Sequence, residues 1–145
     1  MIKEYKWLSV VINKKQWKVN ASYNRFSKVI VLYPSFFKLS IVRQYSILEH
    51  EYSHHIYWRM PILYRKLWEF ISNWKLIKVL NIMWITKYKK NAFVSEYAKT
   101  KSTEDFAECI EIKYLSDNDK KKTFKTYADF KMKIAYSMYT YFSNQ

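Results

Sequence analysis

The sequence predicts an α+β fold, in which a small N-terminal sheet, antiparallel or mixed, packs on a mainly helical remainder. Three observations support this prediction. The 145 residues suffice for one domain over residues 1–145 and are too few for two ordinary ones. Strand-forming residues are concentrated before residue 34. Helical spacing of apolar residues begins near residue 37.

The first region, residues 7–33, is rich in Val, Ile, Trp and Tyr and contains two polar interruptions. These interruptions, at residues 13–15 and 23–25, are typical of turns between short strands. The region therefore predicts three strands, the last of which is closed by Pro34.

The next region predicts one long helix. From about residue 37, apolar residues recur at spacings of three and four, which is typical of a helical face that packs on the core. These residues are Ile41, Tyr45, Leu48, Tyr52 and Ile56. Because the residue before a proline disfavours helical geometry, Pro61 is expected to end the helix at about residue 59 or 60.

A second amphipathic stretch follows between Leu63 and Trp84, with a bend or break expected near Asn81. The surrounding segment 61–90 is aromatic and basic, and its simplest interpretation is an addition to the core. A helix that binds a membrane surface or a partner is the alternative interpretation of this segment.

Two more helices are predicted in the C-terminal third. Ser102 or Thr103 suits the N-cap of a helix that runs to about residue 115. A last, aromatic helix is expected over roughly residues 123–142.

The composition excludes several classes of function. The chain contains no glycine, so it has no P-loop, no Rossmann fingerprint and no nucleophile elbow. Its single cysteine, Cys109, excludes an internal disulfide framework and is expected to be a packed small side chain. The net charge of +14 allows non-specific nucleic-acid binding, but the basic residues are scattered along the chain.

All three histidines of the chain lie between residues 50 and 55, where His50, Glu51 and His54 form an HExxH motif. Residues four apart lie on one face of a helix, so both imidazoles can bind one zinc ion. The adjacent Glu51 can then reach a water that the ion activates. The alternative to metal binding is that His50 and His54 belong to the polar face of a surface helix. His55 is not expected to be a ligand, because it points about 100° away from His54.

A third ligand is needed for a complete site. The sequence after His54 lacks the glycine and further histidine of metzincins, which leaves a carboxylate from another helix. Glu104 is the best candidate, with Glu108 and Glu96 as rivals. Glu104, Glu108 and Glu111 share one helical face, and Glu108 is expected to accept a hydrogen bond from a ligand imidazole.

Two segments in this order resemble the gluzincin metallopeptidases: HEYSH at residues 50–54, and YAKTKSTEDFAE at residues 97–108. The resemblance is strongest to the anthrax lethal factor-like peptidase domain, and the small archaeal minigluzincins are similar in size and plan. The two motifs cover about a fifth of the chain. The resemblance implies a zincin-like fold and one zinc ion bound by His50, His54 and Glu104. It also implies Glu51 as general base, Tyr97 as the phenol that stabilises the oxyanion, and Glu108 as support for a ligand.

The expected function is therefore zinc-dependent endopeptidase activity on a peptide or protein substrate, with an edge strand that binds the extended peptide. A latent form, with the last helix over the cleft or in an oligomer interface, is a further possibility. The alternative from another class is a basic nucleic-acid-binding or interaction protein on an inactive metallopeptidase scaffold. No signal peptide or membrane span is recognised, so the sequence predicts a cytoplasmic location.

Overall fold

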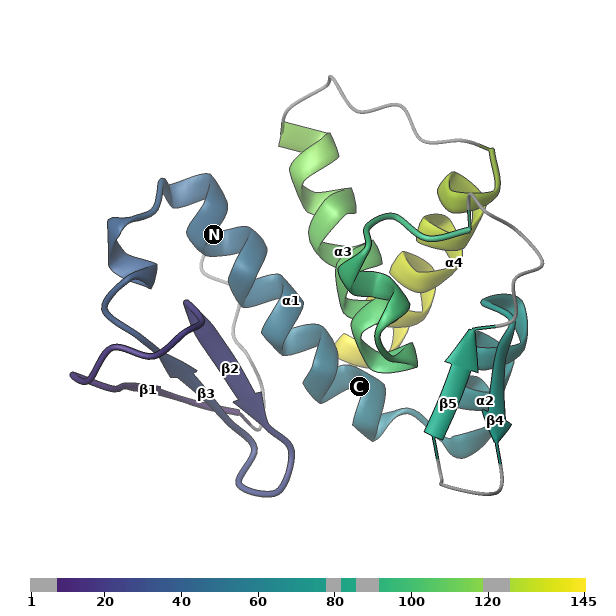
Figure 1. Ribbon diagram of the computed structural model, residues 1–145, viewed down its shortest axis with the longest axis horizontal. Coiled ribbons are helices and arrows are strands. Elements are labelled where there is room, and N and C mark those ends of the chain that lie inside the picture. The colour runs from purple at the N-terminus through teal and green to yellow at the C-terminus, as the bar shows by residue number, and fades with distance from the viewer. Residues whose placement is uncertain (1–7, 78–81, 86–91, 119–125) are drawn as a thin grey trace.

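The computed structural model describes residues 8–77, 82–85, 92–118 and 126–145. It confirms an α+β fold with a mixed sheet and a mainly helical remainder. A long helix, α1 (Ile41–Arg59), lies in the middle of the molecule. The sheet lies on one side of α1, and helices α3 (Ser102–Asn118) and α4 (Thr126–Ser143) lie on the other (Figure 1). The zincin-like assignment stays a prediction.

The sheet contains the three strands expected from the sequence: β1 (Ser9–Ile12), β2 (Ala21–Asn24) and β3 (Val29–Leu32). Their order is β1-β3-β2, with β1 parallel and β2 antiparallel to β3. Buried side chains of Ala21, Ile30 and Leu32 join the hydrophobic core. Strand β2 is therefore an edge of this sheet, and it packs against α1.

The C-terminal end of α1 agrees with the prediction, whereas the helix begins at Ile41, a few residues after the expected start near residue 37. Ser40 caps its first turn by accepting a hydrogen bond from the backbone amide of Arg43, and the helix ends at Arg59, two residues before Pro61. A short 3₁₀ turn, η1 (Phe36–Lys38), precedes it.

The predicted apolar face of α1 is wrong in its first half. Ile41 and Tyr45 are 70% and 44% exposed, whereas Tyr52 and Ile56 are almost completely buried. The second half of α1 is enclosed on several sides because β2, α3 and α4 all pack against the helix. Polar residues such as His55 are consequently buried there as well. A prediction of one apolar face therefore fails for a helix that is buried on opposite sides.

The predicted amphipathic helix between Leu63 and Trp84 is also wrong in its second half. Helix α2 (Ile62–Ile71) ends early, and an antiparallel hairpin follows, formed by β4 (Trp74–Ile77) and β5 (Ile82–Ile85). Asn73 has φ of 58°, a left-handed conformation that asparagine tolerates and that stops a helix. Trp74 is then buried and donates a hydrogen bond from Nε1 to Asp105 Oδ2 at 3.2 Å.

The two C-terminal helices form the rest of the core. Helix α3 already includes Ser102, so it begins slightly earlier than the N-cap expected at Ser102 or Thr103, and it extends three residues beyond the predicted end at 115. Helix α4 begins at Thr126, and residues 123–125 of its predicted span lie outside the described residues. The helices are joined by a fully buried ion pair, in which Lys131 Nζ lies 2.7 Å from Asp105 Oδ1. In the part of the chain that the structure describes, no helix combines the length and apolar character needed to cross a membrane.

Candidate metal centre

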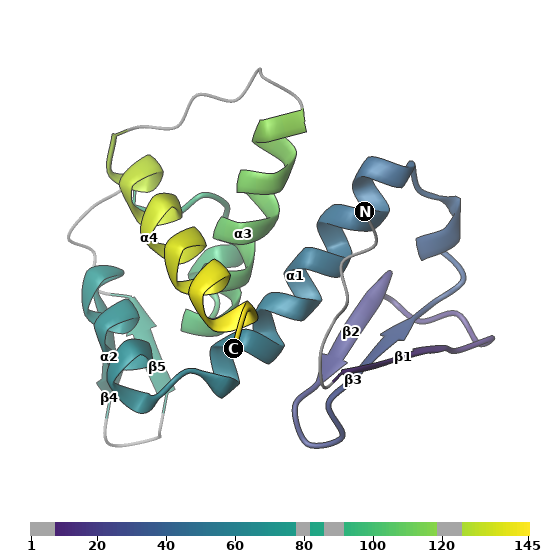
Figure 2. The same ribbon diagram turned by 180° about the vertical axis from the view of Figure 1, so that it is seen from behind.

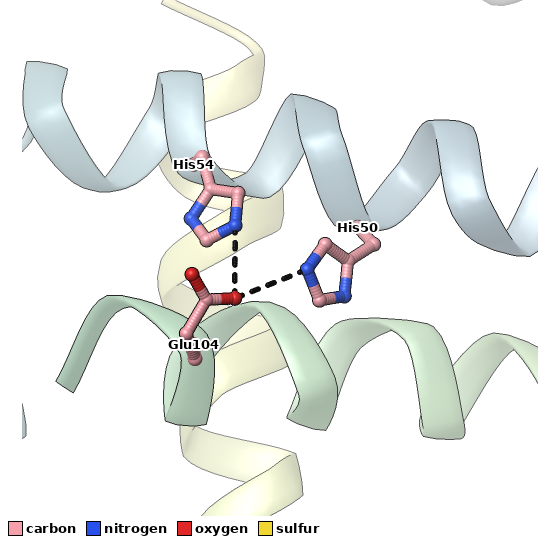
Figure 3. Close-up of side chains that lie close together, drawn as sticks. All are labelled: His50, His54 and Glu104. Carbon is pink, nitrogen blue, oxygen red and sulfur yellow. Dashed lines mark ion pairs between the residues drawn. The ribbon is translucent and has the colours of Figure 1, made fainter. Parts of the chain in front are cut away.

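Three side chains converge between the adjacent helices α1 and α3 (Figure 3). His50 and His54 lie one turn apart on α1, and Glu104 lies in the first turn of α3. The Oε2 atom of Glu104 is 3.3 Å from His50 Nε2 and 3.2 Å from His54 Nε2. The three side chains are only 10–14% exposed, so the cluster is largely shielded from solvent.

These positions fit a divalent cation. Ligand atoms that each lie about 2.1 Å from a tetrahedral zinc ion are about 3.4 Å from one another, close to the two observed separations. Glu104 Oε2 is buried and accepts no hydrogen bond from any described residue. A buried, unsatisfied carboxylate oxygen is costly. Coordination of an ion by His50, His54 and Glu104 would satisfy this atom, and two imidazoles with one carboxylate form a donor set that zinc favours.

The other ring nitrogen of His50 faces two more glutamates of α3. Its Nδ1 atom lies 2.9 Å from Glu111 Oε2 and 3.4 Å from Glu108 Oε1. Glu108 thus lies beside a candidate ligand, as expected, but Glu111 makes the shorter contact. The sequence places Glu111 on the correct helical face, and only the relative rotation of α1 and α3 reveals which glutamate is nearer. Helix α1 also holds Glu111 through an ion pair with Arg43.

The electrostatics of the cluster favour a positive charge. Burial alone lowers the pKa of His50, but Glu104, Glu108, Glu111 and Glu51 outweigh it and raise this pKa well above its ordinary value. Burial alone raises the pKa of Glu104, but the imidazoles of His50 and His54 outweigh it and lower this pKa far below its ordinary value. Several carboxylates therefore surround His50, and their negative charges stabilise a proton or a cation there.

Glu51 lies next to this cluster in a different environment. It is buried, and burial raises the pKa of its carboxyl group, although the charges of His50 and His54 act in the opposite direction. A backbone hydrogen bond links Glu51 to Tyr23 on β2. A carboxylate whose pKa is raised by burial is a better proton acceptor than an exposed one, which suits a general base.

Tyr97 lies in a short 3₁₀ turn, η2 (Tyr97–Lys99), directly before α3. The residue is 54% exposed, and its ring stacks on the His50 ring, with 6.4 Å between the centroids and an interplanar angle of 26°. Burial and the charge of Glu104 raise the pKa of its phenol, so the hydroxyl stays protonated and able to donate. The structure thus places Tyr97 beside the cluster at the solvent-exposed side.

The remaining candidates lie apart from the cluster. His55 is buried on the sheet side of α1, where its Nδ1 atom lies 3.0 Å from the Tyr23 hydroxyl. Glu96 is exposed and pairs with Lys99. Cys109 is fully buried, and burial raises the pKa of its thiol well above the ordinary value, as expected for a packed side chain. Among the described residues, none of these three belongs to a group that could hold a metal ion.

An open groove of about 470 Å³ leads from the cluster toward the sheet. One wall is formed by β2 and the turn after it, and the other by α1 and the start of α3. The groove-lining residues are Ser22, Tyr23, Asn24, Arg25, Phe26, His54, Trp58, Lys101, Thr103 and Glu104. His54 and Glu104 thus line a groove that is also lined by an edge strand.

Comparison with known proteins identified no related protein. The sequence matches no protein-family model, and neither the curated proteins nor the solved structures contain a significant match.

Proposed function

We propose that this protein is a zinc-dependent endopeptidase, in which His50, His54 and Glu104 hold one zinc ion. The observation that carries the proposal is the convergence of two imidazole nitrogens on Glu104 Oε2, a buried oxygen with no hydrogen bond among the described residues. A polar face of a surface helix would leave the two imidazoles in solvent, whereas here both lie within 3.3 Å of one buried carboxylate oxygen. The resemblance of the two motifs to those of gluzincin metallopeptidases supports the same conclusion.

Each nearby side chain has a role in peptide hydrolysis. A bound zinc ion supplies Lewis-acid chemistry, lowering the pKa of water toward ~7 and polarising a carbonyl group. Glu51, whose pKa is raised by burial, accepts a proton from the attacking water and returns it to the leaving amine. Tyr97, whose phenol stays protonated, donates a hydrogen bond to the oxygen that becomes negatively charged.

The groove is suited to an extended peptide. Strand β2 is an edge strand of the described sheet and lines the groove with Ser22, Tyr23 and Asn24. An edge strand presents backbone groups outside the sheet, and an extended peptide can pair with those that are not already bonded, as the Tyr23 backbone is to Glu51. Such pairing would place a peptide bond next to His54 and Glu104, which line the same groove.

Helix α4 is not among the elements that line this groove. It packs against α3 and α1 on the side away from the sheet, as the rear view shows (Figure 2). Its Tyr139 hydroxyl donates a hydrogen bond to Glu49 of α1. The described part of the C-terminal region therefore belongs to the core, and α4 does not cover the groove.

The test is hydrolysis of a diverse peptide library by zinc-loaded protein, with products identified by mass spectrometry. Cleavage should be abolished by a chelator and reduced by roughly 10²- to 10⁴-fold in Glu51→Gln. Glu69→Gln, a change of a glutamate on α2 that pairs with Lys66 outside the groove, is the matched control and should retain activity. Hydrolysis that survives both chelation and Glu51→Gln would refute the proposal.

A further inference from the structure

The groove carries a cationic wall beside the candidate metal centre. Arg25, in the turn after β2, places its guanidinium group 4.5 Å from the centroid of the Trp58 ring and 4.6 Å from that of Phe26. These cation–π contacts hold the side chain in a defined position. Lys101 lines the same groove directly before α3.

Neither cation is neutralised within the described structure. Among the ion pairs that the described residues form with one another, none includes Arg25 or Lys101. Among the described residues that line the groove, Glu104 is the single acidic one. When Glu104 binds a divalent cation, the charge that remains along the groove is positive.

The distance from the cluster to this wall corresponds to about two residues of peptide. Trp58 follows His54 by four residues on α1, and four helical residues rise by ~6 Å. An extended peptide rises by ~3.3 Å per residue. A peptide bond held at His54 and Glu104 would therefore bring a group within about two residues of it against Trp58 and Arg25.

We infer that this groove recognises a carboxylate on its substrate, placed within about two residues of the scissile bond, and that Arg25 is the principal specificity-determining residue. The inference deepens the proposed peptidase function and rests on it. A planar guanidinium that is already oriented can bind a carboxylate through two parallel hydrogen bonds. The carboxylate can belong to an Asp or Glu side chain or to the C-terminus of a peptide.

The first arm of the experiment measures cleavage by the zinc-loaded full chain. Peptide pairs differ only by Glu against Gln, or Asp against Asn, at successive positions, and each is made with a free and an amidated C-terminus. We expect kcat/KM to be roughly 10- to 100-fold higher for the peptide that bears a carboxylate near the cleaved bond. An effect of the side chain identifies an acidic-residue preference, and an effect of the free terminus alone identifies a C-terminal preference; either supports the inference.

Variants test whether Arg25 causes the preference. Arg25→Glu should remove the discrimination between Glu and Gln peptides. Lys14→Glu makes the same change of net charge on an exposed residue outside the groove, and it should retain the full discrimination. A preference that persists unchanged in Arg25→Glu would overturn the assignment.

A second arm measures binding without catalysis. Fluorescence anisotropy of labelled Glu and Gln peptides is recorded with zinc-loaded Glu51→Gln, which retains the three candidate ligands. Equal cleavage and equal binding of both peptides would overturn the inference and leave the peptidase proposal intact. Binding selective for the Glu peptide without any cleavage by the unmodified protein would support carboxylate recognition and refute the peptidase proposal. If the protein neither cleaves the peptides nor binds the Glu peptide selectively, the peptidase proposal and the carboxylate inference are both refuted.

Discussion

His50 Nδ1 lies 2.9 Å from Glu111 Oε2, so a carboxylate of α3 fixes the far side of a candidate zinc ligand on α1. Glu111 is itself held by Arg43, and Ser46 Oγ donates to Glu111 Oε1 at 3.5 Å. When Nδ1 carries the ring proton, Nε2 has a free lone pair, and this nitrogen faces Glu104. Glu111 therefore orients His50 and increases its basicity from the ring nitrogen opposite the one that faces Glu104.

Replacement of Glu111 should weaken zinc binding. We expect Glu111→Gln to raise the dissociation constant for zinc by roughly 10- to 100-fold, because the imidazole loses its charged partner. Glu108→Gln should have a smaller effect, since Glu108 Oε1 lies farther from Nδ1, at 3.4 Å. Competition with a chromophoric chelator measures both constants. A larger effect of Glu108→Gln than of Glu111→Gln would contradict this ranking.

Removal of the Tyr97 hydroxyl should impair turnover more than binding. In Tyr97→Phe the ring can still stack on His50, but the donor to the developing oxyanion is lost. We expect kcat to fall by roughly 10²- to 10³-fold, with little change in KM. Steady-state kinetics on a cleaved peptide measures both, and Tyr141→Phe, a change of an exposed tyrosine on α4, is the control. Equal kinetics of the two variants would exclude the assigned role.

His55 should make the fold sensitive to acid. Burial, and then the charges of Arg59 and Lys28, lower its pKa from 6.5 to about 4. The unfolded chain therefore takes up a proton at a higher pH than the folded protein does. Stability that is present above pH 6.5 is lost as the pH falls toward 4.

Urea unfolding of metal-free protein at pH 7.5 and 4.5 tests this prediction. Between these two values the unfolding free energy of the unmodified protein should fall by roughly 2 kcal/mol more than that of His55→Gln. Comparison of the two proteins cancels the titration of groups that they share. An identical pH dependence would show that His55 is accessible to protons in the folded state.

The buried ion pair between α3 and α4 should be essential for stability. Lys131 and Asp105 are both completely buried, and Lys131 also lies 4.2 Å from the centroid of the Phe93 ring. Lys131→Met leaves Asp105 without its cation and should cost roughly 3–5 kcal/mol in urea unfolding.

Lys133→Met removes an exposed pair with Asp129 on the same helix and should change stability by less than about 1 kcal/mol. Similar small effects of the two methionine variants would show that the buried carboxylate finds another partner.

The sequence predicts the elements that depend on local chemistry. Pro61 sets the end of α1, and the turn-forming residues after β1 and β2 separate the three strands. The HExxH spacing is local in the same sense, because any helix places His50 and His54 on one face. The second motif is local as well, because a helix that begins near Ser102 places Glu104 in its first turn.

Features that depend on tertiary contacts are not predicted. The helical spacing between Leu63 and Trp84 does not reveal that Asn73 adopts a left-handed conformation, which ends α2. The choice of Glu111 over Glu108 depends on how α1 and α3 are rotated against each other. The sequence does not predict the cation–π contact between Arg25 and Trp58 either. The two residues are 33 positions apart in the sequence and come together only in the folded protein.

Zinc content is the most direct test of the central claim that His50, His54 and Glu104 form a metal site. Protein purified without a tag or chelator is dialysed against zinc and then buffer, and its metal is measured by inductively coupled plasma mass spectrometry. We predict one zinc ion per chain, and a large loss of zinc in Glu104→Ala that remains folded by circular dichroism. Absence of zinc from the unmodified protein, or equal zinc in Glu104→Ala, would contradict the account.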